Sequence, residues 1–178
     1  MHRTALARIA IAAAAALSVC AATGTSAQQK EKVTYKVGAE NTQYPQRHTI
    51  EVGDTPGHTV GVFEIHRTYA AANAPTINGL KLKESWARGY SDYVSNNGLS
   101  TNYQTFVAEN GDRFHAVSHS MGHADESGKR STVGVGHITG GTGKFSGIRG
   151  LVRSNGASDG AKGFNETSSE IEYWFVGH

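Results

Sequence analysis

Residues 99–123 decide the fold, and they read LSTNYQTFVA-ENG-DRFHAVSHSMGH. On either side of the Glu-Asn-Gly segment, apolar and polar side chains alternate along the chain. Such alternation is typical of a β-strand with one covered face, because successive side chains of a strand point to opposite faces. An Asn-Gly pair between two alternating runs is a strong local signal for a hairpin. The stretch therefore predicts two long antiparallel strands joined by a tight turn.

The length of this turn fixes which residues face one another across the hairpin. A two-residue turn opposes Tyr103 to Ser118. A three-residue loop that ends with Gly111 in the left-handed conformation opposes Tyr103 to Val117 instead. That arrangement keeps the apolar residues of both strands on one face. We therefore predict the longer, bulged loop.

The same pattern extends outward from the hairpin over the chain beyond residue 30. Glycine-rich or Asn/Asp-rich turns separate alternating runs, and no sustained helical repeat interrupts them. The predicted strands are 33–37, 48–52, 58–68, 80–94, 99–108, 113–123, 130–139, 145–153 and 162–176. Strands joined in succession by short turns favour an up-and-down meander, which removes its exposed edges by closing. We predict an all-β fold, a single antiparallel barrel of about eight strands, as one domain over residues 31–178.

The N-terminal segment predicts export. Arg3 and Arg8 precede an apolar run over residues 9–19, and small residues then lead to Ala27. This is the layout of a secretory signal peptide over residues 1–27, with cleavage after Ala27. Its apolar core is too short for a permanent membrane span. The expected location is the periplasm or the outside of the cell.

Processing also decides which chemistry remains in the mature chain. Residues 17–20 read LSVC and are similar to a lipoprotein box, in which Cys20 would carry a lipid. Cleavage after Ala27 instead leaves no cysteine, and therefore no disulfide and no thiol nucleophile. The leader holds two of the 17 basic residues and none of the 15 acidic ones, so the rest carries 15 of each. No Lys/Arg cluster approaches nucleic-acid-binding density, which disfavours nucleic acid as a partner.

Residues 138–150 read ITGGTGKFSGIRG. This stretch resembles the Gly-Gly-(Thr/Ser)-Gly-x-Phe-x-x-(aliphatic or aromatic)-x-Gly signature of the allene oxide cyclase and dirigent superfamily, and the strand order around it fits over residues 58–178. In structural terms, the first glycines permit a tight reversal at Gly143, after which Phe145 returns to the core. The resemblance implies an eight-stranded barrel with a mostly apolar lumen, assembled as dimers or trimers. It also implies binding of a hydrophobic small molecule and steering of a cyclisation or coupling, and it carries over no catalytic residue.

Residues 80–94 show the clearest period of two. Lys81 and Lys83 fall on one face, which is predicted to meet solvent because lysines prefer water. If the opposite face lines the barrel, its charged groups beside aromatic rings would hold the polar end of a ligand in an apolar cup. If the strand instead passes the barrel rim there, those charges are solvated. The predicted ligand-binding residues, two of them added through the hairpin register, are Glu84, Trp86, Arg88, Tyr90, Tyr103 and His119.

Three histidines form a second candidate site. Folding the chain at residues 126–127 sets Val117 opposite His137, with His115 and His119 diagonal to it. Diagonal neighbours on a sheet lie about 7–8 Å apart, so three imidazoles could meet on one zinc or copper ion. The alternatives are a ligand-facing or proton-shuttling role and ordinary packing or solvation. Ordinary packing or solvation is favoured, so no metal and no cofactor is predicted.

Two functions remain open at this point. The chain is an exported barrel that holds an apolar small molecule unchanged, or an isomerase or cyclase acting on such a molecule. They differ in whether a perturbed acid–base group lies deep in the lumen. A structural role in the envelope rests on export alone and predicts a filled interior. The predicted partners are an apolar small molecule and further copies of the chain, in a homodimer or homotrimer.

Overall fold

The computed structural model describes residues 29–177. The predicted leader, its cleavage site after Ala27 and Cys20 lie outside the described residues. Within them, the strands are β1 (Glu31–Gly38), β2 (Thr42–Glu51), β3 (His58–Thr68), β4 (Thr76–Ile77), β5 (Leu80–Val94), β6 (Asn97–Ala108), β7 (Arg113–Ala124), β8 (Lys129–Gly141), β9 (Ile148–Asp159) and β10 (Phe164–Phe175). Short 3-10 segments are η1 (Ala39–Asn41), η2 (Gly143–Phe145) and η3 (Gly160–Lys162). The all-β prediction is confirmed, and β9 begins and ends later than predicted.

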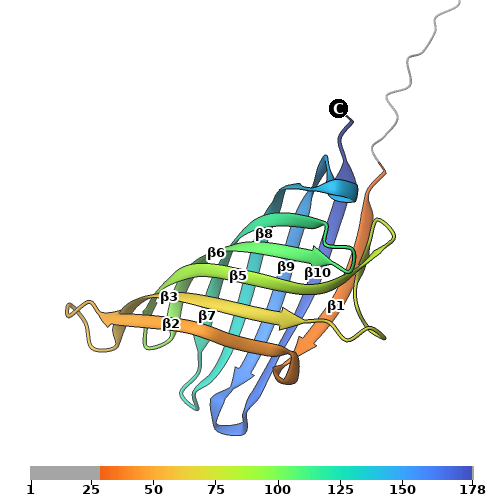
Figure 1. The fold of residues 1–178 in the computed structure, drawn as a ribbon. Helices are drawn as coiled ribbons and strands as arrows, with labels where there is room; N and C mark the ends of the chain where they lie inside the picture. Colours follow the sequence, from red (N-terminus) through yellow and green to blue (C-terminus); the bar gives the residue numbers. More distant parts are fainter. Residues whose placement is uncertain (1–28, 178) are drawn as a thin grey trace, which may run out of the picture.

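The strands form one strongly curved antiparallel sheet in the order β1-β10-β9-β8-β7-β6-β5-β3-β2, with β4 paired to β5 (Figure 1). From β5 to β10 each strand pairs with the next, which is the predicted up-and-down meander. The path holds nine strands, one more than the predicted eight. Its two ends, β1 and β2, are not paired in the described part of the chain. They are joined covalently through η1, where the Thr42 hydroxyl donates to the Gly38 carbonyl at 2.9 Å.

The β6–β7 hairpin has the predicted register. Tyr103 lies opposite Val117, and Leu99 lies opposite Met121. The loop closes with the Ala108 N–H donating to the Asp112 carbonyl at 2.9 Å. Gly111 supplies the positive φ of 90° that this three-residue loop needs. The turn residues together with the apolar alternation of the two strands were therefore enough to predict this pairing.

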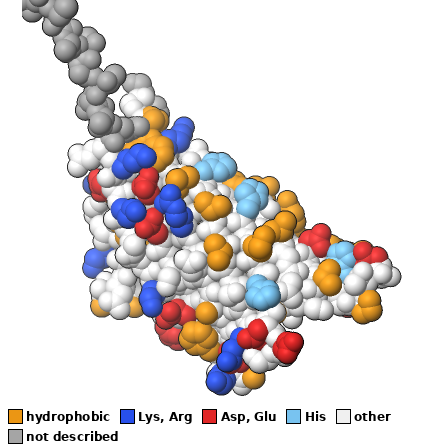
Figure 2. All heavy atoms as spheres, turned by 180° about the vertical axis from the view of Figure 1, so that it is seen from behind, with side chains coloured by type: hydrophobic (Ala, Val, Ile, Leu, Met, Phe, Trp, Pro, Cys, Tyr) orange, Lys and Arg blue, Asp and Glu red, His pale blue; other side chains and the backbone are white. Residues whose placement is uncertain are grey.

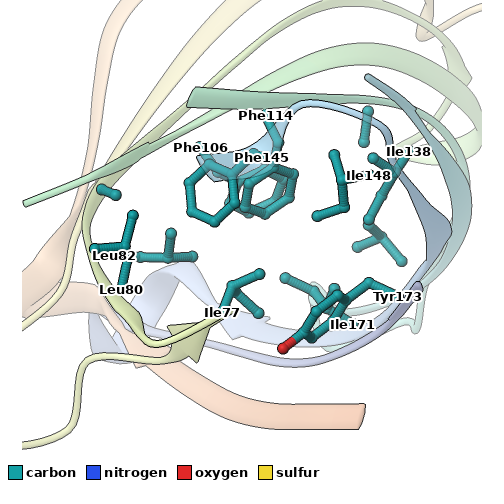
Figure 3. Packing of buried hydrophobic residues seen from close by; sticks show 13 residues of the cluster. Ile77, Leu80, Leu82, Phe106, Phe114, Ile138, Phe145, Ile148, Ile171 and Tyr173 are labelled. Atoms are coloured by element: carbon teal, nitrogen blue, oxygen red, sulfur yellow. The ribbon is translucent and has the colours of Figure 1, made fainter. Parts of the chain in front are cut away.

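An apolar core fills one end of the barrel (Figure 3). Phe106 stacks on Phe114 with ring centroids 4.5 Å apart, and Phe145 meets Phe114 edge-on at 5.3 Å. Phe145 reaches this position from η2, and all three rings are buried. Tyr173, also buried, accepts a hydrogen bond from the Asn78 N–H at 2.9 Å and donates to the Glu31 carboxylate. The reversal at residues 140–147 thus returns an aromatic ring that closes this end, as predicted for Phe145.

A β-bulge at Lys83 changes which face of β5 points inward. Leu82 pairs with Ala108 and Glu84 pairs with Val107, so Lys83 has no partner in the ladder. An unpaired residue of this kind shifts the alternation by one position. Leu82 is therefore buried, while beyond the bulge Ser85 is buried instead of Glu84.

None of the helical segments within residues 29–177 is long and apolar enough to span a membrane.

Candidate functional site

The end of the barrel away from the apolar core holds a cavity of about 670 Å³. That volume lies within the ordinary range for small-molecule sites. Polar and apolar side chains share the walls. The inward positions of β6, β7 and β9 carry Ser100, Asn102, Ser120 and Ser154, and Phe63 of β3 adds an aromatic patch. The resemblance implied a mostly apolar lumen, whereas this cavity is polar and apolar in similar measure.

Hydrogen bonds hold the polar wall in place. The Gln104 amide donates to the Asn102 carbonyl oxygen at 2.9 Å and to the Ser118 hydroxyl at 3.1 Å. The Tyr69 hydroxyl donates to the Ser85 hydroxyl at 2.8 Å. Buried polar groups that are satisfied by one another stiffen the wall that they line. A ligand would therefore meet a cavity that is already shaped.

Two tyrosines stand between this polar wall and the apolar core. The rings of Tyr35 and Tyr69 meet edge-on with centroids 5.5 Å apart. Burial raises the pKa of both phenols, and for Tyr69 the neighbouring Tyr35 raises the pKa further. Both side chains are therefore neutral near pH 7, as hydroxyls that donate or accept hydrogen bonds.

The charged groups of the cavity are all cationic. Arg47 of β2, Arg67 of β3 and Arg130 of β8 line it, and no Asp, Glu or His belongs to its described lining. The described lining therefore holds no carboxylate and no imidazole, the commonest acid–base groups. The arrangement is suited to holding a ligand.

The six residues predicted to bind a ligand inside the barrel do not line this cavity. The placement was wrong for Glu84, Trp86, Arg88 and Tyr90 because the bulge at Lys83 turns them outward. It was wrong for Tyr103 and His119 because the apolar face of the β6–β7 hairpin is the outer one. Any ligand role of these six residues would belong to the outer surface, and stays a prediction. On these strands, the side chains that line the cavity belong to the residues next to these six in the sequence, which point to the other face of the sheet.

On the outside, the predicted ladder of charged and aromatic groups does exist. His66 of β3 stacks on Trp86 with centroids 4.0 Å apart, and its Nε2 lies 2.9 Å from a Glu84 carboxylate oxygen. The Arg88 guanidinium lies over the Trp86 ring at 5.1 Å and pairs with Glu64. These charges are thus satisfied within the surface of β3 and β5.

Apolar side chains and histidines gather on the outer face (Figure 2). The register places Leu99, Met121 and Val133 in one row across β6, β7 and β8. A neighbouring row holds Tyr90, Thr101, His119 and Val135. Tyr103 is 59% exposed and Met121 62%. We call the set Tyr90, Leu99, Tyr103, Met121, Val133 and Val135 the outer apolar face.

The predicted pairing behind the histidine site is confirmed, since Val117 lies opposite His137. The metal site is not formed: the described residues contain no group of three His, Cys, Asp or Glu that could hold an ion. A register shift between His115 and Ala116 sets His115 beside Gly140. The Nδ1 atoms of His115 and His119 instead lie 3.1 and 3.0 Å from the Thr105 and Thr101 hydroxyls.

Sequence reasoning missed the arginines that line the cavity. Arg67 and Arg130 each lie within a run that alternates, and each shares the inward face of its strand with small or apolar residues. For β8 that face continues as Thr132, Gly134 and Gly136. An arginine on a face of glycines and a threonine was the available signal, but it indicates a cavity only once that face is known to point inward.

Comparison with known proteins gives little further. No protein-family model matches the chain, and no curated protein matches it. Three chains of solved structures match. One is described as the pterocarpan synthase dirigent protein GePTS1; it is 15% identical, the match covers 93% of this chain and 98% of that one, and the TM-score is 0.48. A likeness of this extent indicates neither a family nor an activity for this chain.

Proposed function

We propose that the protein is an exported β-barrel that binds a small molecule in the cavity at its polar end. The observation that carries the proposal is the cavity itself, which is bounded by a hydrogen-bonded polar wall and backed by a rigid apolar core. A barrel with a purely structural role has no need of an open interior of this size. Membership of the allene oxide cyclase and dirigent superfamily, from the resemblance at residues 138–150, is part of the same proposal.

Binding is favoured over isomerase or cyclase chemistry. General acid–base catalysis needs a group whose pKa lies near the working pH. The described lining offers only tyrosines and arginines for this role, and burial moves the pKa of Tyr35 and Tyr69 further from neutrality. A cyclase of this kind would act by holding its substrate in one shape, without proton transfer from these groups.

Self-association through the outer apolar face belongs to the same proposal. Contiguous exposed apolar patches on soluble proteins commonly mark protein–protein contacts. Here the partner is a second copy of the chain, because the six residues of the face are uncharged and the nearest ion pair on the β9 side, Arg153 with Glu170, lies beyond them. Two such faces would pack with the apolar rows of β6, β7 and β8 together.

One experiment tests these statements together: native mass spectrometry of the exported protein. We expect a mature chain that begins at Gln28, a mass of more than one subunit, and a retained small molecule. Thr132→Phe, which fills the cavity, should lose the small molecule, whereas the control Thr34→Phe on the exposed outer side of β1 should keep it. Met121→Lys should leave single subunits. A lipid on Cys20, a single-subunit mass for the unaltered protein, or a small molecule that Thr132→Phe retains would each contradict the corresponding statement.

A further inference from the structure

Two arginines of the cavity have buried nitrogen atoms without a hydrogen-bond partner. They are Nε of Arg67 and both Nε and Nη2 of Arg130. A guanidinium carries five N–H donors, and a buried donor without an acceptor costs free energy comparable to a lost hydrogen bond. Most buried polar groups in proteins are satisfied for this reason. These nitrogens are closed to solvent, so the two side chains offer a ligand in the cavity their positive charge and their remaining N–H groups.

Arg130 is held in position by contacts that use none of its donors. Its guanidinium lies over the Tyr93 ring at 4.4 Å. The bare backbone of Gly122 lies against the edge that carries Nε and Nη2, where an added Cβ would be 2.1 Å from Nη2 and 2.7 Å from Cζ and Nε. Stacking on an aromatic ring orients the planar group, and the Nη1 amino group points away from Gly122. Gly122 thus forms a cradle that fits this guanidinium.

The described lining of the cavity contains no carboxylate. At the mouth, Asp159 lies 3.9 Å from Lys162. Asp125 accepts the N–H groups of Ser127 and Lys129 at 2.9 and 3.0 Å. Both carboxylates have these other partners and neither lines the cavity, so the net charge of its described lining is positive.

Arg67 offers a second cationic contact toward the apolar core. It lies opposite Ser85 in the sheet, and its charge acts on the phenols of Tyr35 and Tyr69. An anion beside Arg67 would therefore also have neutral hydroxyl groups nearby. Arg130 lies instead at the mouth, opposite Ser158. The cavity therefore carries a positive charge both near the core and at the mouth.

We propose that the molecule held in the cavity is an organic anion, with a carboxylate or sulfonate on an aromatic body. Its anionic group accepts hydrogen bonds from the Nη1 amino group of Arg130, and its rings pack among the aromatic side chains of the wall. Arg67 supplies a further contact on the core side. This inference rests on the proposed binding function and replaces the purely apolar ligand that the sequence predicted.

The test compares two fluorescent probes of nearly equal body and different charge. 1-Anilinonaphthalene-8-sulfonate carries a sulfonate, and N-phenyl-1-naphthylamine is neutral. We expect the unaltered protein to bind the sulfonate at least about tenfold more tightly, because charge-assisted hydrogen bonds are the strong ones. Arg130→Gln should remove about tenfold of that affinity and change the neutral probe by less than about twofold. Arg67→Gln should act in the same direction.

The control is Arg153→Gln, which removes the same charge from the outer side of β9, where Arg153 pairs with Glu170 at 3.0 Å. It should leave both probes unchanged. Equal affinity of the two probes, or equal losses of both in Arg130→Gln, would overturn the anion proposal and leave the binding function standing. Failure of both probes to bind would overturn the binding function itself. Probe binding that survives both arginine variants and falls in Met121→Ser would place the probe on the outer apolar face and overturn both.

Discussion

Gly143 allows a sharp test of how the apolar end is closed. It has φ +53°, in the left-handed region that costs other residues about 1–2 kcal/mol. An added Cβ would also lie 2.0 Å from a carboxylate oxygen of Asp112. That carboxylate accepts the Lys144 N–H at 2.9 Å, one residue before the buried Phe145. Gly143→Ala therefore strains the backbone and displaces the side chain that fixes the reversal.

The two effects together set the expected magnitude. Left-handed strain contributes about 1–2 kcal/mol, and moving the Asp112 carboxylate away loses its charge-assisted hydrogen bond from the Lys144 N–H, about 1–2 kcal/mol more. We expect Gly143→Ala to lower the free energy of unfolding by roughly 2–4 kcal/mol. For a chain of this size, that corresponds to a fall in Tm of roughly 5–15 °C.

Urea unfolding, followed by tryptophan fluorescence, separates strain from steric overlap in a series of glycine variants. Gly111→Ala has the strain alone, since φ is +90° and no atom lies within 4 Å of the added Cβ. Gly160→Ala has neither and should be near neutral. In an Asp112→Ala background, Gly143→Ala should cost no more than Gly111→Ala does. A loss for Gly143→Ala equal to that for Gly111→Ala, with no coupling to Asp112, would refute the reasoning.

Two further predictions concern charged groups. The hydrogen bond to Asp92, and to a smaller extent the one to Asp54, raises the pKa of His58 above its ordinary 6.5. The stability that this ion pair adds is therefore present below pH 6.5 and is lost as the pH rises through the raised pKa. Urea midpoints of Asp92→Asn and the unaltered protein should therefore differ most below pH 6.5 and converge at higher pH; a constant difference would exclude this origin. Gly122→Ala should push Arg130 off its ring, lower sulfonate-probe affinity by about tenfold and leave the far-ultraviolet spectrum unchanged, whereas unchanged affinity would show that the cradle does not position Arg130.

Local sequence signals explain why the strands and the pairing of two neighbouring hairpins could be predicted. The three-residue loop at residues 109–111 depends on one glycine with positive φ, and the pairing of Tyr103 with Val117 follows from it. The predicted pairing of Val117 with His137 likewise follows from the position of the turn between β7 and β8. Turns and alternation depend on a few neighbouring residues, so they can be predicted from the sequence.

The inward face could not be predicted in this way, because it depends on residues far along the chain. On β5 the alternation is broken at Lys83, whose neighbours give no local sign of a bulge. Seen alone, the strand places Trp86 with Leu82, and both were expected inside. The partner strand β6, which pairs Leu82 with Ala108 and Glu84 with Val107, decides otherwise. A bulge of this kind is set by the fit of two strands at the closed end.

The closed end also explains why half of the barrel has its polar side chains inside. Phe106 shares a face with Asn102, and Phe114 shares a face with Ser118. Burying a large apolar side chain stabilises by about 1.5–3 kcal/mol, so the two stacked rings fix the parity of both strands. The polar residues are then carried inward, and Met121 with its neighbours is carried outward. Apolar surface left outside in this way is stabilised when a second copy covers it, and the polar surface inside is suited to an anion that hydrogen-bonds to it. The two proposals, self-association and anion binding, therefore follow from the same constraint.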